Sequence, residues 1–157
     1  MTRSANEVMV LAGKAARGAG APPAQAAQFG AAAVWHLQQG RDVAALDAAL
    51  AALPAGPILD LPLAIARIVE RGEGASVLPP APLAQSYVET LPFVARMDAQ
   101  GRVEIDLTTP APRKVPQRIA LDPQTYAGWS ALAAKLLVPE SDASRLSGAG
   151  AGLTDND

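Results

Sequence analysis

The chain contains a single histidine, His36, which follows Trp35 in an apolar stretch with helical spacing. An imidazole exchanges protons near neutral pH, so His36 is a candidate catalytic acid or base. The alternative is a structural histidine on a helix, which is the more common situation. One imidazole cannot hold zinc alone, and the chain has neither an HExxH motif nor a cysteine. We therefore predict no metal site, and the sequence indicates no particular cofactor.

Two basic side chains near the end of the first predicted helix form a second candidate site. Lys14 and Arg17 precede Gly18-Ala19-Gly20, whose small side chains leave an arginine fork free to bind a carboxylate or phosphate. The residue order is not that of a P-loop, and the end of a helix disfavours anions. The alternative is that both side chains only compensate the helix dipole.

The last ten residues begin with alternating glycine and alanine over residues 148–152 and end in Asp155, Asn156 and Asp157. No strand precedes this segment, so it lacks the context of a dinucleotide-binding fingerprint. It is either a disordered tail or an extended arm that carries its acidic end into a groove. In the second case, where the segment is an extended arm, Asp155 and Asp157 are candidate catalytic carboxylates. The other ligand-binding candidates near this end are Ser144, Arg145 and Asn156.

Several helices must position these residues in the first half of the chain. Residues 4–72 are predicted to form about four short helices, separated by glycines and prolines. Ser4 and Glu7 have the spacing of a capping box for the first helix, and Asp60 is the predicted start of the fourth. Residues 73–86 contain Pro79, Pro80 and Pro82 and are predicted to form an extended connector rather than a helix.

The second half, residues 87–139, changes to a β pattern and then to a helix. Strands are predicted over 91–97 and 102–108, joined by a turn in which Gly101 can take a positive φ. Residues 115–121 are a candidate edge strand, and a helix is expected from Asp122 to about Val138. The fold class is therefore α+β, with a small antiparallel sheet of two to three strands. We predict one domain over residues 1–139 and an extended Gly-rich C-terminal arm over 140–157.

The two glycine-containing segments resemble a known bacterial family when they are taken together. The segments are Lys14-Ala-Ala-Arg-Gly-Ala-Gly20 and Gly148-Ala-Gly-Ala-Gly-Leu-Thr-Asp-Asn-Asp157. The pair is similar to bacterial proteins catalogued as a domain of unknown function, and the resemblance covers nearly the whole chain. It implies an ordinary domain with a native C-terminus, and it implies no particular activity.

Composition limits the classes of partner and compartment. The chain has 157 residues, a formal net charge of -2 and a pI of about 5.4, so no basic excess favours nucleic acid or an anionic membrane. No signal peptide or apolar run long enough to span a bilayer is visible, and we expect a cytoplasmic protein. Aromatic residues are only 4% of the chain, so burial between subunits would add needed apolar area, and we expect a homo-oligomer, with a dimer favoured.

Two functions remain open at this point. The first is a small soluble enzyme or ligand-binding protein that acts on a small anionic metabolite, with the basic residues holding the anion and His36 or a C-terminal aspartate moving protons. The second is a non-catalytic accessory subunit or an oligomeric scaffold. A concave site that joins Arg17, His36 and the C-terminal segment favours the first, and a large flat apolar face favours the second.

Overall fold

The structure, a computed structural model, describes residues 1–72, 76–112 and 114–137 and has the predicted α+β fold. In chain order its elements are β1 (Thr2–Arg3), α1 (Ala5–Gly18), α2 (Pro23–Gln38), α3 (Ala44–Ala52), α4 (Pro57–Arg71), β2 (Ser76–Val77), α5 (Pro82–Glu89), β3 (Phe93–Met97), β4 (Arg102–Pro110), β5 (Ile119–Ala120) and α6 (Pro123–Ala134).

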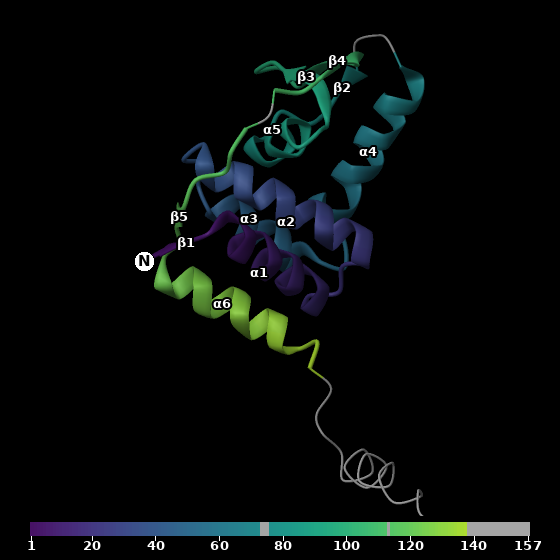
Figure 1. Ribbon diagram of the computed structural model, residues 1–157. Helices are drawn as coiled ribbons and strands as arrows, with labels where there is room; N and C mark the ends of the chain where they lie inside the picture. The colour runs from purple at the N-terminus through teal and green to yellow at the C-terminus, as the bar shows by residue number, and fades with distance from the viewer. Residues whose placement is uncertain (73–75, 113, 138–157) are drawn as a thin grey trace, which may run out of the picture.

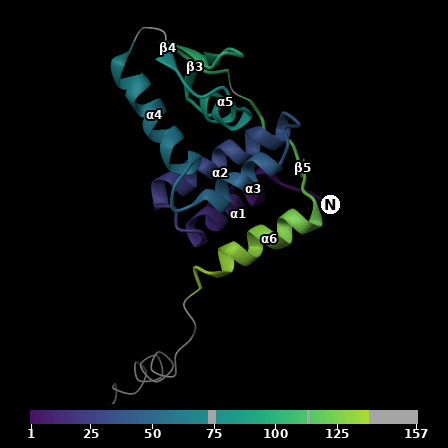
Figure 2. The same cartoon turned by 180° about the vertical axis from the view of Figure 1, so that it is seen from behind.

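The described elements form a helical layer and a smaller β region. Helices α1, α2, α3 and α6 lie together, and α5 lies between them and the three-stranded sheet (Figure 1). Helix α4 runs along one side of the molecule from the helical layer up to the sheet, as both views show (Figure 2). The strand order of that sheet is β2-β4-β3, and β1 pairs with β5 in a separate two-stranded sheet. All the pairings are antiparallel.

Local signals in the sequence position several element ends correctly. The Ser4 hydroxyl accepts a hydrogen bond from the Glu7 amide at 3.2 Å, and the Glu7 carboxylate accepts one from the Ser4 amide at 2.7 Å. This is the predicted capping box, and it begins α1 at Ala5. Pro23 begins α2, and Asp122 caps α6 through the amides of Gln124 and Thr125.

The predicted hairpin turn is also confirmed. Strands β3 and β4 pair directly across residues 98–101, where the Asp98 carboxylate accepts hydrogen bonds from the Gln100 and Arg102 amides, each at 2.9 Å. Gly101 has φ of +82°, and a Cβ there would collide with the carbonyl oxygen of Leu78. The turn therefore needs glycine both for its backbone conformation and for the close approach of the β2 end.

The predicted connector over residues 73–86 is wrong from Pro82 onward. Strand β2 occupies Ser76–Val77, and α5 begins at Pro82. The physical reason is that proline is tolerated in the first turn of a helix, where its missing N–H has no helix partner anyway. The closely spaced prolines therefore precede and begin a helix here, and they do not exclude one.

Three other element boundaries differ from the prediction. Helix α4 begins at Pro57 and not at Asp60, because Gly56, with φ of +87°, supplies the change of direction that a cap requires. Of residues 115–121 only Ile119–Ala120 forms a strand, and it pairs with the N-terminal Thr2–Arg3 rather than with the hairpin. Helix α6 ends at Ala134. The predicted arm over 140–157 lies outside the described residues, and the domain boundary at 139 stays a prediction.

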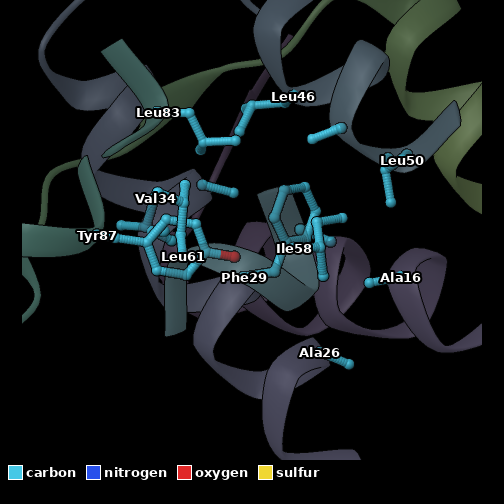
Figure 3. Close-up of a cluster of buried hydrophobic side chains, with 14 of the residues drawn as sticks. Ala16, Ala26, Phe29, Val34, Leu46, Leu50, Ile58, Leu61, Leu83 and Tyr87 are labelled. Carbon is cyan, nitrogen blue, oxygen red and sulfur yellow. The ribbon is translucent and has the colours of Figure 1, made fainter. Parts of the chain in front are cut away.

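The core is built from alanine, leucine, isoleucine and valine with few large side chains. Phe29 of α2 is fully buried at its centre, against Ile58 and Leu61 of α4 (Figure 3). Trp129 of α6 is 1% exposed, and its indole N–H donates to the Asp47 carboxylate at 2.7 Å. Among the described residues, those classed as polar and fully enclosed in this core are His36 and Ser86.

Candidate functional site

His36 lies in the last turn of α2 and is fully buried. Its Nε2 is 2.9 Å from the backbone carbonyl of Asp42, and its Nδ1 is 2.9 Å from the hydroxyl of Ser86 in α5. Both ring nitrogens therefore have partners. The contacts join the end of α2 to the loop that follows it and to a helix 50 residues further along the chain.

The partners of His36 determine its tautomer. Burial is the main cause that lowers the pKa of His36, so the imidazole is neutral at pH 7. A carbonyl can only accept, so Nε2 carries the proton and donates to Asp42. Nδ1 is then the acceptor of a hydrogen bond that the Ser86 hydroxyl donates. In this state Ser86 does not donate to the Pro82 carbonyl, which lies 2.9 Å away, because a hydroxyl has only one proton.

An ion pair extends this cluster toward the surface. The Arg41 guanidinium donates to both carboxylate oxygens of Glu89, each at 2.7 Å, and to the Ser86 hydroxyl at 2.8 Å. The two charged side chains are only 14% and 21% exposed. A bidentate pair of this kind fixes the rotation and position of a helix. We call His36, Arg41, Ser86 and Glu89 the α2–α5 polar cluster.

The α2–α5 polar cluster has the parts of an activated nucleophile but not its accessibility. A serine hydroxyl that donates to a histidine is the arrangement that deprotonates a nucleophile. Ser86 and His36 are each 0% exposed, so a substrate has no route to the hydroxyl in this conformation. What the cluster does in the structure is to hold α5 against α2. A catalytic role for His36 stays a prediction.

Three of the four residues of the α2–α5 polar cluster are not among the sites predicted from the sequence. Ser86 falls in the predicted connector over residues 73–86, while Arg41 and Glu89 lie outside every predicted helix and strand, so no predicted element groups the three. Ser86 and Glu89 are three residues apart on α5 and so lie on one face of the helix. A helix prediction from Pro82 would have revealed that spacing, but not the match to Arg41, which lies 45 residues from Ser86 in the chain.

The other basic candidates lie far from His36. Lys14 and Arg17 are exposed on α1, near the connection to α2. A Cβ on Gly30 would touch the Met9 carbonyl, and one on Gly13 would touch that of Ala26, so α1 and α2 are antiparallel. His36 follows the start of α2 by 13 residues (Pro23 to His36), or roughly 20 Å at 1.5 Å per residue. The structure therefore does not bring His36 together with Lys14 and Arg17.

The candidates near the C-terminus cannot be placed. Ser144, Arg145, Asp155, Asn156 and Asp157 lie outside the described residues. Their predicted roles and the docking of the arm therefore stay predictions. The predicted homodimer also stays a prediction, because the structure contains one chain.

A concave basic region surrounds Trp35, the neighbour of His36 on α2. Two adjoining pockets share Trp35 and Lys114 in their walls. The first has a volume of about 320 Å³ and includes Glu89 and Arg96. The second has a volume of about 430 Å³ and includes Arg118. We call the two pockets together the Trp35 groove.

The groove combines cationic groups with apolar walls. The Lys114 ammonium lies 5.5 Å from the centroid of the Trp35 ring, within the range of a cation–π contact. Arg118 donates to the Thr2 carbonyl at 3.0 Å, which holds its guanidinium in place. Apolar side chains from the end of α5, from the loop after it and from β3 line the first pocket: Val88, Leu91, Phe93, Val94 and Ala95. Composition and spacing gave no signal for this groove, because its residues come from three separate stretches of the chain.

Three further findings bear on the site. Within the described part of the chain, no three His, Asp or Glu side chains gather as metal ligands would. No single described helix has the length and hydropathy of a membrane span, and α3 and α4 reach it only in combination, across a 94° bend. Comparisons with protein families, with curated proteins and with solved structures found no match to this chain.

Proposed function

We propose that this protein binds a small organic anion in the Trp35 groove. The observation that supports the proposal is the placement of Lys114 over the Trp35 ring, where two pockets meet. An ammonium at that point can hold a carboxylate while the indole contacts the rest of the ligand. A small anion is also the class of ligand expected from the sequence, but the residues proposed here to bind it are not the ones that the sequence predicted.

Local charge favours an anion even though the whole chain has a formal net charge of -2. Arg96, Lys114 and Arg118 are cationic and line the groove, and Glu89 is its one acidic residue among those described. The carboxylate of Glu89 is already neutralised by the bidentate contact with Arg41. A concave surface of one charge sign raises the local concentration of ligands of the opposite sign.

The walls of the groove favour a ligand with a flat apolar part. Trp35 and Phe93 supply ring surfaces, and the neighbouring residues are aliphatic. The pocket volumes of about 320 and 430 Å³ match those of small-molecule sites. An aryl carboxylate meets both requirements, with its ring on the apolar wall and its charge beside Lys114.

Titration with benzoate tests the proposal, followed by calorimetry and by the fluorescence of the two tryptophans. The chain has three lysines, which allows matched charge removals. We expect Lys114→Gln to weaken benzoate binding about fivefold or more, the size of a charge-assisted hydrogen bond at a partly exposed site. Lys135→Gln, which removes an exposed lysine after α6, is expected to leave binding unchanged.

Lys14→Gln distinguishes the two basic regions. Equal loss of binding in all three variants would mean that benzoate affinity depends only on the net charge of the protein, and the proposal would be wrong. Loss in Lys14→Gln alone would move the anion site to the end of α1, where the sequence predicted it.

A further inference from the structure

Tyr87 of α5 carries a polar atom that nothing in the described structure satisfies. The side chain is 3% exposed, and its hydroxyl has no hydrogen-bond partner among the described residues. Figure 3 shows the ring extending into the core with its oxygen among Phe29, Ile58 and Leu61. Burial raises the pKa of Tyr87 well above its usual value, so the hydroxyl keeps its proton and remains a donor. A buried donor without an acceptor destabilises the fold.

The same tyrosine forms part of the wall of a pocket between α4 and α5. The pocket has a volume of about 410 Å³ and lies on the other side of Thr90, Leu91 and Phe93 from the Trp35 groove. Its apolar walls come mainly from α4: Pro62, Ile65, Ala66 and Val69. No basic residue lines it, and its polar side chains are Gln28, Glu70, Tyr87 and Thr90. The Thr90 hydroxyl already donates to the Tyr87 carbonyl at 2.7 Å.

We propose that the α4–α5 pocket binds a small neutral molecule with an apolar body and one oxygen acceptor, which receives the hydrogen bond of the Tyr87 hydroxyl. The apolar walls select the body of the ligand, and the unpaired donor selects a carbonyl or ether oxygen. Glu70 at the pocket and the absence of cations among its lining residues disfavour an anion. This pocket and the Trp35 groove therefore take different classes of ligand.

The Tyr87 hydroxyl is closed off from solvent. The oxygen acceptor of a ligand can therefore reach it only if helix α4 moves. Pro62 lies inside α4 and lines the pocket. A proline inside a helix removes one N–H donor from the hydrogen-bond ladder and weakens the helix at that point. The position at which Pro62 weakens α4 thus lies at the α4–α5 pocket, where the helix has to move.

Acetophenone and α-methylstyrene are the probes for this site. They have nearly the same shape, but only acetophenone has an oxygen acceptor. Binding is followed by the δ1-methyl NMR signals of the isoleucines, because Ile65 lines the pocket and Ile119 lies in β5, away from it. We expect acetophenone to shift the Ile65 signal in a saturable way and to leave the Ile119 signal in place.

Tyr87→Phe removes the hydroxyl and keeps the ring. We expect this variant to bind acetophenone about fivefold more weakly and α-methylstyrene as the native chain does. We also expect its melting temperature to rise by about 3 °C, because the unpaired donor is gone. Tyr126→Phe is the matched control, since the other tyrosine of the chain lies on α6 under the guanidinium of Arg3.

Three results would overturn the proposal. The first is an Ile65 signal that does not move with acetophenone. The second is equal acetophenone affinity in the native chain and Tyr87→Phe. The third is a lower melting temperature of Tyr87→Phe than of the native chain, which would mean that the hydroxyl has an acceptor in the free protein.

Discussion

Helix α2 contacts α1 and α5 in two physically different ways. Against α1 the contact is made by small side chains and backbone, with Gly30 close to the carbonyl of Met9 and Gly13 close to that of Ala26. Against α5 the contact depends on buried polar groups, with His36 bonded to Ser86. The first contact uses no side-chain hydrogen bond in the described structure. The second uses the one between His36 and Ser86, and Arg41, just beyond the end of α2, adds bonds to Ser86 and Glu89.

The difference explains why both candidate pockets lie on the α5 side. Alanines and glycines let two helices approach until their backbones touch, which leaves no space for a ligand. Larger side chains such as Tyr87 and Trp35 keep elements further apart and leave hollows beside them. Directed hydrogen bonds then supply the orientation that close packing supplies elsewhere.

The largest expected effect comes from breaking the close contact of α1 with α6. A Cβ on Gly18 would overlap the carbonyl oxygen of Leu132, which belongs to backbone and cannot rotate away. We expect Gly18→Ala to lower the free energy of unfolding by about 3 kcal/mol. Urea denaturation followed by circular dichroism measures the change.

Gly128→Ala is the matched control on α6. Nothing lies within 4 Å of a Cβ at this position, so only helix propensity changes. We expect it to raise the free energy of unfolding by about 1 kcal/mol. If Gly18→Ala and Gly128→Ala had the same effect, the contact between α1 and α6 would not be as close as described.

A smaller loss is expected from the α2–α5 polar cluster. Glu89→Gln removes the charge that faces Arg41 and leaves the guanidinium partly buried without an anion. We expect a loss of about 2 kcal/mol, less than for a fully buried pair because both side chains retain some contact with water. Glu104→Gln on β4 removes an equal charge at an exposed position. A similar loss in both variants would contradict the assigned role of the pair.

The smallest expected effect is a dependence of stability on pH through His36. Because the pKa of His36 is lowered in the folded state, the unfolded chain binds more protons below about pH 6.5, the pKa of an ordinary histidine. The free energy of unfolding should therefore fall as the pH is lowered from 7 to 5. The groups around the ring that act on it are Arg41, Asp42 and Glu89.

His36→Gln provides the comparison for this pH effect. The variant is expected to be less stable than the native chain at pH 7, with a shallower decrease between pH 7 and 5. Denaturation at several pH values measures both slopes. Parallel slopes in the two proteins would show that His36 does not contribute to the pH dependence.

The elements that sequence reasoning predicted well are those that short-range interactions define. The capping box of Ser4, the turn ending at Gly101 and the Asp122 cap each involve residues at most four apart. Such local contacts can form independently of the tertiary fold. The helix that was not predicted, α5, has no side-chain cap and begins at a proline. Its helical state depends on the burial of Leu83, Ala84 and Val88 against other elements.

The sequence by itself therefore determined the fold class, the four N-terminal helices and the hairpin, and, because it has no cysteine, it leaves no thiol for chemistry. Only the tertiary structure decided what His36 contacts, because its partner Ser86 is 50 residues away. It also decided that Lys114 lies over Trp35 and that the Tyr87 hydroxyl is enclosed. Each of these depends on how separate elements pack, and packing joins residues whose separation in the chain carries no local signal.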